Sequence, residues 1–249
     1  MCNETIKTYL VVGANEGIGR AIADLIVSKG HRLIAFDKSY DEILIEQHPN
    51  VIKVCCDITD ISSIRNATRI VREKCEQLDG IANIAADVYF ETFSRDFEAW
   101  ERSVIGGPAA YSVIVTELRN LMGTGASIVN MSSISAHIAQ KGYGTYSASK
   151  AAVSALSRAM ALELGSSGIR VNSISPGTTW TKNNAYYIGE EFNVDLEEAN
   201  QHPELGQMQL LGRLAMPNEI AEPIYFLLSE KSSFITGIDL IVDGGYTTK

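Results

Sequence analysis

Short apolar runs alternate with stretches of helically spaced apolar residues along almost the whole chain. Tyr9–Val12 and Leu33–Phe36 are continuous apolar runs, as is typical of strands buried on both faces. Between them Ile18, Ile22 and Leu25 recur at intervals of three or four, which predicts an amphipathic helix. Repeated alternation of strand and helix predicts parallel strands joined by helical crossovers.

The same reasoning places the remaining elements. The predicted strands are Tyr9–Val12, Leu33–Phe36, Val51–Cys56, Ile81–Ala86, Ser127–Met131, Arg170–Ile174 and Ile238–Val242. The predicted helices run from Ile18 to Gly30, from Ile64 to Leu78, and over Phe97–Met122, Tyr146–Leu164 and Asn218–Leu228. The expected fold class is α/β: a single doubly wound Rossmann-type domain, with a mostly parallel seven-stranded sheet and helices on both faces.

One irregular stretch, 178–216, interrupts this pattern within the single domain 1–249. A long insertion after a strand's carboxyl end is usually a lid, because ligands bind at that edge of such sheets. The stretch contains four aromatic residues, Trp180, Tyr186, Tyr187 and Phe192. Aromatic side chains there favour a flat or cyclic ligand, and the alternative is that they pack on one another.

A glycine-rich turn joins the first predicted strand to the first helix. It reads Gly13-Ala14-Asn15-Glu16-Gly17-Ile18-Gly19. Glycines let the backbone turn tightly and approach a pyrophosphate, which free N–H groups at a helix N-terminus stabilise. The spacing differs from the G-x-G-x-x-G fingerprint, so a turn without a ligand is the alternative. The strand before and the helix after favour a dinucleotide site.

Asp37 ends the second strand, close to the expected position of a ribose-binding acid. Its carboxylate would accept a hydrogen bond from the 2′-hydroxyl and repel a 2′-phosphate. Glu16 adds a second negative charge that would repel a 2′-phosphate, whereas the positive charge of Lys38 would attract one. We therefore expect NAD as the cofactor, and the alternative for Asp37 is an ordinary turn residue.

A tyrosine and a lysine four residues apart, Tyr146 and Lys150, open a predicted helix. Residues at this spacing share a helix face, and an adjacent cation lowers the pKa of a phenol. Ser133 ends the preceding strand, where its hydroxyl could hold a substrate oxygen or cap backbone groups. His137, four residues further on, is either a substrate contact or incidental.

Composition narrows the function classes. The chain has 249 residues, of which 45% are hydrophobic, and a net charge of −9, which disfavours a nucleic-acid partner. No apolar run reaches the length of a membrane helix, and the N-terminus lacks a secretory pattern. Cys2, Cys55, Cys56 and Cys75 have no metal-ligand spacing. We expect a cytoplasmic protein with free thiols, no metal site, and no nucleic-acid or membrane partner.

Over nearly its full length the chain resembles the short-chain dehydrogenase/reductase (SDR) family. The glycine turn, Ser133, Tyr146 and Lys150 stand in the family's order. Further matches, also in order, are Asp57 after the third strand, Asn83 in a variant of the N-N-A-G motif, Pro176-Gly177, Thr236-Gly237 and Asp243-Gly244-Gly245. Each motif is weak alone, but their joint order and spacing are specific.

The resemblance implies roles for these residues. Tyr146 would be the general acid/base, Ser133 would orient the reacting oxygen, and Lys150 would lower the Tyr146 pKa and bind the nicotinamide ribose. The cofactor-binding residues would be Gly13, Glu16, Gly17, Ile18, Gly19, Asp37, Asp57, Ile58, Asn83, Tyr146, Lys150, Pro176, Gly177, Thr179 and Thr181. Among them, Asp57 and Ile58 would meet the adenine, and Thr179 and Thr181 the nicotinamide end.

One departure from the family concerns proton transfer. The family has a catalytic Asn seven residues after an aromatic residue such as Trp100, where this chain has Gly107, inside Gly106-Gly107-Pro108. The family Asn supports a helix kink and a water that relays protons to the lysine. Gly-Gly-Pro could kink the helix alone, so we expect a working enzyme with an altered relay.

These observations predict an NAD(H)-dependent oxidoreductase that transfers a hydride between a secondary alcohol, cyclic and polyhydroxylated alcohols included, and the ketone. The alternative is a dinucleotide-binding protein with little turnover, acting as a sensor or partner subunit. A third reading, an acyl-chain reductase using NADP, is disfavoured by Glu16 and Asp37.

Three alanines, Ala152, Ala155 and Ala159, form a small-residue strip on one helix. Such a strip could let another helix approach closely, so a homo-oligomer, a tetramer or dimer, is expected. The alternative is that these alanines only raise helix propensity.

Overall fold

The computed structural model describes residues 5–40, 48–92 and 96–248, so Cys2 lies outside the described residues. A seven-stranded sheet has the order β3-β2-β1-β4-β5-β6-β7, and each neighbouring pair is parallel. The strands are β1 (Thr8–Val12), β2 (Arg32–Asp37), β3 (Val51–Cys55), β4 (Leu78–Asn83), β5 (Met122–Met131), β6 (Arg170–Pro176) and β7 (Asp239–Val242). The predicted Rossmann-type sheet is confirmed, and its strand order reverses between β1 and β4.

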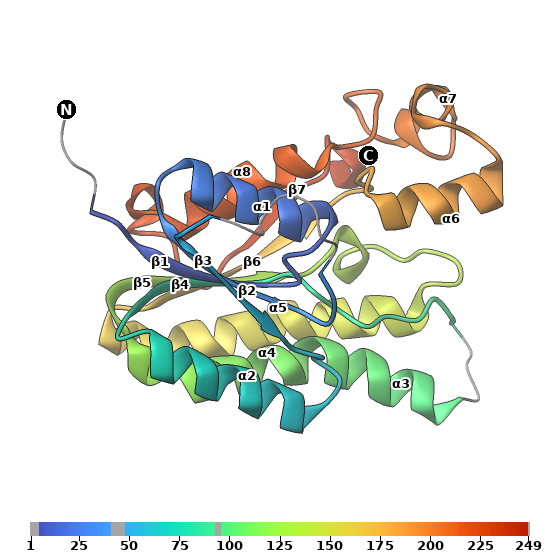
Figure 1. Cartoon of the computed structure of the whole chain (residues 1–249). Coiled ribbons are helices and arrows are strands. Elements are labelled where there is room, and N and C mark those ends of the chain that lie inside the picture. The colour runs from blue at the N-terminus through green and yellow to red at the C-terminus, as the bar shows by residue number, and fades with distance from the viewer. Residues whose placement is uncertain (1–4, 41–47, 93–95, 249) are drawn as a thin grey trace.

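Helices cover both faces of the sheet, as Figure 1 shows. Helices α1 (Gly17–Ser28) and α8 (Pro217–Leu228) lie on one face; α2 (Ile61–Lys74), α4 (Ala110–Leu118) and α5 (Gly144–Leu164) lie on the other. The first helix ends just before Gly30, whose φ of +81° suits the left-handed region. Within the described ranges, no helix is long and apolar enough to cross a membrane.

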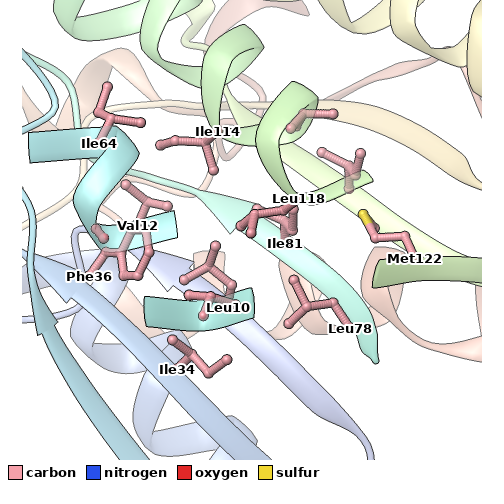
Figure 2. Packing of buried hydrophobic residues seen from close by; sticks show 14 of the residues in the cluster. Leu10, Val12, Ile34, Phe36, Ile64, Leu78, Ile81, Ile114, Leu118 and Met122 are labelled. Atoms are coloured by element: carbon pink, nitrogen blue, oxygen red, sulfur yellow. The ribbon is translucent and has the colours of Figure 1, made fainter. Parts of the chain in front are cut away.

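Each face of the sheet has its own apolar core. On the α2/α4 side, Leu10 and Phe36 from the central strands meet Ile64 of α2 and Ile114 of α4 (Figure 2). On the opposite side, Val11 and its neighbours pack against α1 and α8. Because side chains alternate along a strand, each central strand supplies both cores. This two-sided burial explains the continuous apolar runs in the sequence.

Two predicted helices extend too far. Leu78, assigned to the helix after the third strand, begins β4, because α2 ends at Lys74 and Cys75 already has extended dihedrals. Met122, assigned to the long third helix, begins β5. Both residues are apolar and lie at helical spacing from the preceding helix, so the apolar periodicity continues past the residue at which each helix ends. The segment Ile84–Ala86, predicted as strand, follows β4 as a loop.

The long helix predicted over Phe97–Met122 is broken in the middle. Helix α3 (Phe97–Val104) is followed by a wide turn, Ile105–Ala109, and then by α4. Gly106 and Gly107 depart from helical dihedrals inside this turn. Pro108 follows them and lacks the N–H that the helical ladder requires. The sequence Gly-Gly-Pro therefore forms the expected kink.

The predicted lid contains more regular structure than its composition suggested. It holds α6 (Lys182–Phe192) and α7 (Leu196–Gln201), drawn in orange at one end of the molecule in Figure 1. Asp195 and Glu198 form a capping box that starts α7, a signal the sequence already held. Trp180 and Phe192 pack on a small aliphatic cluster inside the segment, so these two side chains contribute to the packing of the segment itself.

Candidate active site

A cleft of about 720 Å³ lies at the carboxyl ends of the strands. Ser133, Tyr146 and Lys150 line it, together with the predicted residues Gly13, Glu16, Gly17, Ile18, Gly19, Asp37, Pro176, Gly177, Thr179 and Thr181. A smaller cleft of about 150 Å³ is lined by Asp57 and Ile58 and shares Gly13 and Asp37 with the first. The structure thus brings residues from six segments, far apart in the sequence, to one edge of the sheet, as such folds predict.

Asn83 is the predicted cofactor residue that lies outside the linings of both clefts. Its side chain is fully buried in the sheet, where Nδ2 donates to Oδ1 of Asn130 at 2.8 Å. Asn130 in turn donates to Ser157 Oγ of α5 at 2.9 Å. The motif match had suggested a contact with the cofactor, whereas the geometry gives Asn83 a place in a buried network that joins β4, β5 and α5.

The glycine turn is built for a close approach of backbone to ligand. Gly13 and Gly17 have φ values of +86° and +57°, in the left-handed region. The N–H of Gly13 donates to Phe36 O at 2.7 Å, which ties the turn to β2. Among the described side chains none caps the N-terminus of α1, so its first N–H groups remain for an anion. These features fit a pyrophosphate.

Asp37 faces the cleft and also supports the turn. Its Oδ2 accepts a hydrogen bond from the backbone N–H of Asn15 at 3.0 Å. Asp37 and Lys38 line both clefts, while Glu16 lines the larger one. The two interpretations of Asp37, turn residue and ligand residue, are therefore compatible in the same side chain.

The smaller cleft contains charged groups that the sequence did not indicate. Arg102 of α3 pairs with Asp87 at 2.7 Å, and both line this cleft beside Asp57. Oδ1 of Asp57 accepts from the N–H and hydroxyl of Thr59 at 2.9 and 2.7 Å. Those hydrogen bonds hold the pKa of Asp57 below its usual value. Asp87 comes directly after the N-N-A-G variant, and this position was the one sequence feature that could have pointed to it as a site residue.

Ser133, Tyr146 and Lys150 form the centre of the larger cleft. Ser133 lies beside Tyr146 and lowers the pKa of its phenol, and its Oγ accepts from the N–H of Ser135 at 3.2 Å. Ser133 thus combines backbone capping with the contact predicted for a catalytic hydroxyl. Nζ of Lys150 lies 5.7 Å from the centroid of the Tyr146 ring and donates to Met131 O at 3.0 Å.

Burial dominates the acid–base properties of this centre. It raises the pKa of Tyr146 above its usual value, and the hydrogen bond with Ser133 offsets part of that rise. Burial also lowers the pKa of Lys150 to about 8. The lowering of the Tyr146 pKa by Lys150, implied by the resemblance, stays a prediction.

Two aromatic side chains, Phe90 and Tyr143, pack on the Tyr146 ring. The Phe90 ring lies 4.9 Å from the rings of both Tyr143 and Tyr146, and Phe90 lines the cleft. The sequence placed aromatic contacts in the lid, yet Phe90 comes from the loop after β4, where no periodic pattern marks it. A reacting carbon beside Tyr146 would therefore meet an apolar wall.

Comparison with known proteins decides the family. A family model described as enoyl-(acyl carrier protein) reductase matches residues 13–247. The chain is 32% identical to 2,3-dihydro-2,3-dihydroxybenzoate dehydrogenase of Escherichia coli (strain K12), over 97% of each chain. It is 34% identical to cis-4-hydroxycyclohexanecarboxylate dehydrogenase of Sinomonas cyclohexanicum, over 97% of this chain and 96% of the relative. This chain belongs to the SDR family.

A solved SDR structure shows the same architecture. The short-chain dehydrogenase family protein from Francisella tularensis aligns with a TM-score of 0.88 at 30% identity, over 98% of this chain and 100% of that one. SDR proteins are oxidoreductases that bind a nicotinamide dinucleotide, and the cleft described above has the shape and polar groups for one. In the part of the chain that the structure describes, no three His, Cys, Asp or Glu side chains are grouped to hold a metal ion.

Gly107 takes the place of the SDR Asn and lies beside α5. A Cβ added there would sit 3.1 Å from Oγ of Ser149, the residue before Lys150. That hydroxyl donates to Ser103 O at 2.8 Å. Ser149 thus ties α5 to the last turn of α3, directly before the kink.

We expect Gly107→Asn to change proton transfer more than cofactor binding. The new amide would stand next to the turn of α5 that carries Lys150, where a relay to that amine would act. The pH dependence of kcat should shift, while the Kd for NADH stays within about twofold of the wild type. Stopped-flow rates across pH and NADH fluorescence titration measure the two quantities. An unchanged pH profile would count against an altered relay.

Proposed function

We propose that this protein is an NAD(H)-dependent dehydrogenase that interconverts a secondary alcohol, cyclic or polyhydroxylated, and its ketone. The observation that carries the proposal is the grouping of Ser133, Tyr146 and Lys150, which line one cleft together with the glycine turn. The relatives named as acting on a dihydroxylated ring acid and a hydroxycyclohexane acid support this substrate class.

The chain's own residues divide the chemistry between them. A nicotinamide dinucleotide held by the cleft would provide the hydride acceptor for oxidation and the hydride donor for reduction. Ser133 donates a hydrogen bond to the substrate oxygen and fixes its position. Tyr146 takes the hydroxyl proton as the carbinol carbon loses its hydride, and it returns a proton to the carbonyl oxygen in the reverse direction. Lys150 holds the nicotinamide ribose, and Phe90 limits water at the reacting carbon.

A panel of reactive diketones and cyclic ketones tests this function without knowledge of the natural substrate. We expect purified protein to oxidise NADH with at least one member of the panel. A protein that binds NADH but turns over none of these ketones would favour the rival role of dinucleotide sensor or partner subunit. The family model's description does not by itself indicate an acyl substrate, so an enoyl thioester belongs in the panel as a separate arm.

The cofactor preference rests on negative charge at the ribose end of the cleft. Asp37 and Glu16 would repel a 2′-phosphate, and Lys38 provides the opposing cation. We expect NADH to bind at least about tenfold more tightly than NADPH. Asp37→Asn keeps the acceptor for the Asn15 N–H and should reduce the ratio by about tenfold.

Fluorescence titration of both cofactors measures this preference. Glu163→Gln is the matched control, because Glu163 is exposed on α5, lies outside both cleft linings and changes the net charge equally. Wild-type protein that binds NADPH as tightly as NADH would contradict the proposed preference.

The surface and the thiols of the protein support a proposal for its assembly and its location. Ala155 and Ala159 are exposed on α5 in the single chain, which supports a close helix contact in a homotetramer or homodimer. Cys55, Cys56 and Cys75 are free, as expected in the reducing cytoplasm. Light scattering on the purified protein checks the assembly, and a monomeric mass would contradict it.

A further inference from the structure

A buried carboxylate lies behind the active centre, on the last strand of the sheet. Asp239 begins β7, and its side chain is only 9% exposed. It accepts hydrogen bonds from Ser154 Oγ of α5 at 2.7 Å and from Ser175 Oγ of β6 at 3.0 Å. His137 Nε2 lies 2.8 Å from Oδ2 and forms the solvent side of the cluster. None of these residues lines the cofactor clefts.

The cluster is connected to the active centre through Ser154. Oγ of Ser154 lies 2.8 Å from Oγ of Ser132, and Ser132 Oγ also contacts the backbone carbonyl of Lys150 at 2.9 Å. Ser132 precedes Ser133, the partner of Tyr146. It follows Met131, whose carbonyl accepts from Lys150 Nζ. A single short segment therefore meets both the amine and the phenol.

The charge of Asp239 decides the direction of these hydrogen bonds. An ionised carboxylate only accepts, so the one hydroxyl proton of Ser154 points to Asp239. Ser154 is then an acceptor toward Ser132, and the Ser132 proton goes to Ser154 or to Lys150 O. All three serines in this cluster are at least 95% buried, where unsatisfied hydroxyl groups are costly. The network consequently specifies one arrangement of the segment 131–133 against α5.

We propose that Asp239, acting through Ser154 and Ser132, is a positioning residue that holds the segment 131–133 against the Lys150 turn of α5. This inference rests on the proposed function. The strand β7 thereby contributes to the active centre although no part of Asp239 reaches the cleft. Without this link the Met131 carbonyl drifts from Nζ of Lys150, and Ser133 drifts from Tyr146. His137 supports Asp239 from outside and is a structural partner rather than a substrate contact.

Two serine variants separate positioning from general stability. Ser154→Ala and Ser175→Ala each remove one buried hydroxyl and one hydrogen bond to the same carboxylate, but only Ser154 contacts Ser132. We expect Ser154→Ala to lower kcat by about tenfold with the KM for NADH unchanged, and Ser175→Ala to stay within about twofold of the wild type. Ser154→Thr retains the hydroxyl and should restore most of the loss.

A second measurement does not depend on turnover. Trace acetylation with acetic anhydride across pH, read by peptide mass spectrometry, gives the reactivity profile of Lys150, with exposed Lys141 as internal reference. Because Met131 O is the acceptor of the ammonium, Ser154→Ala should move the Lys150 profile to lower pH, and Ser175→Ala should not. Identical Lys150 profiles in the two variants overturn the positioning role, whatever their turnover. Wild-type protein without any ketone turnover overturns the proposed function and leaves this labelling comparison to decide the inference separately.

Discussion

We expect Tyr146→Phe to lower kcat for ketone reduction by about a thousandfold and to leave NADH binding nearly unchanged. The variant keeps the ring that packs 4.9 Å from Phe90 and removes only the hydroxyl. Without that hydroxyl no group beside Ser133 supplies a proton to the substrate oxygen, so the barrier to hydride transfer rises. Steady-state rates and NADH titration on the same preparation measure both effects.

The neighbouring tyrosine provides the matched control for this prediction. Tyr143 lies one turn earlier, with its ring 4.9 Å from Phe90 and 5.9 Å from Tyr146. Tyr143→Phe removes an equivalent hydroxyl from the same aromatic group, and kcat should fall by less than about threefold. Equal losses in the two variants would mean that packing, and not proton transfer, accounts for the effect of Tyr146→Phe.

The fold was largely predictable because parallel strands buried on both faces leave continuous apolar runs. Val11 and Leu10 face opposite cores, and both must be apolar. Helix ends were harder to predict, since Leu78 and Met122 continue the apolar spacing of the helices before them. The lid was harder still, because α6 and α7 bury a small cluster of their own, which gives only a weak periodic signal.

The active centre was predictable where residues share one element or one strand end. Tyr146 and Lys150 are one helical turn apart, and Ser133 sits where β5 meets that helix. Ion pairs between segments that are far apart in the sequence leave no spacing pattern from which they could be predicted. Arg102 of α3 pairs with Asp87 of the loop after β4, fifteen positions earlier in the chain. The lowered pKa of Lys150 could not be predicted either. The sequence spacing places an amine beside the phenol, but only the structure shows that the amine is buried.

The third glycine of the turn, Gly19, has the closest backbone approach in the cofactor site. A Cβ built on it would lie 1.7 Å from the carbonyl oxygen of Gly13, far inside van der Waals contact. Gly13 itself has little room, since its own Cβ would lie 2.7 Å from Ala85. The turn is therefore enclosed between α1 and the loop after β4. Any side chain at position 19 must push the turn out of this position, which we propose faces the pyrophosphate.

For this reason Gly19→Ala should weaken NADH binding by at least about a hundredfold. Gly123→Ala is the control, because Gly123 is exposed in β5 and an added Cβ there meets no described atom within 4 Å. Isothermal titration with NADH, together with thermal unfolding of both variants, separates lost binding from lost stability. The expected result is a folded Gly19→Ala protein whose affinity for NADH is lost while Gly123→Ala binds like the wild type. Gly19→Ala protein that binds NADH within about threefold of the wild type would mean that the turn does not face the pyrophosphate, and the dinucleotide site would have to be placed elsewhere.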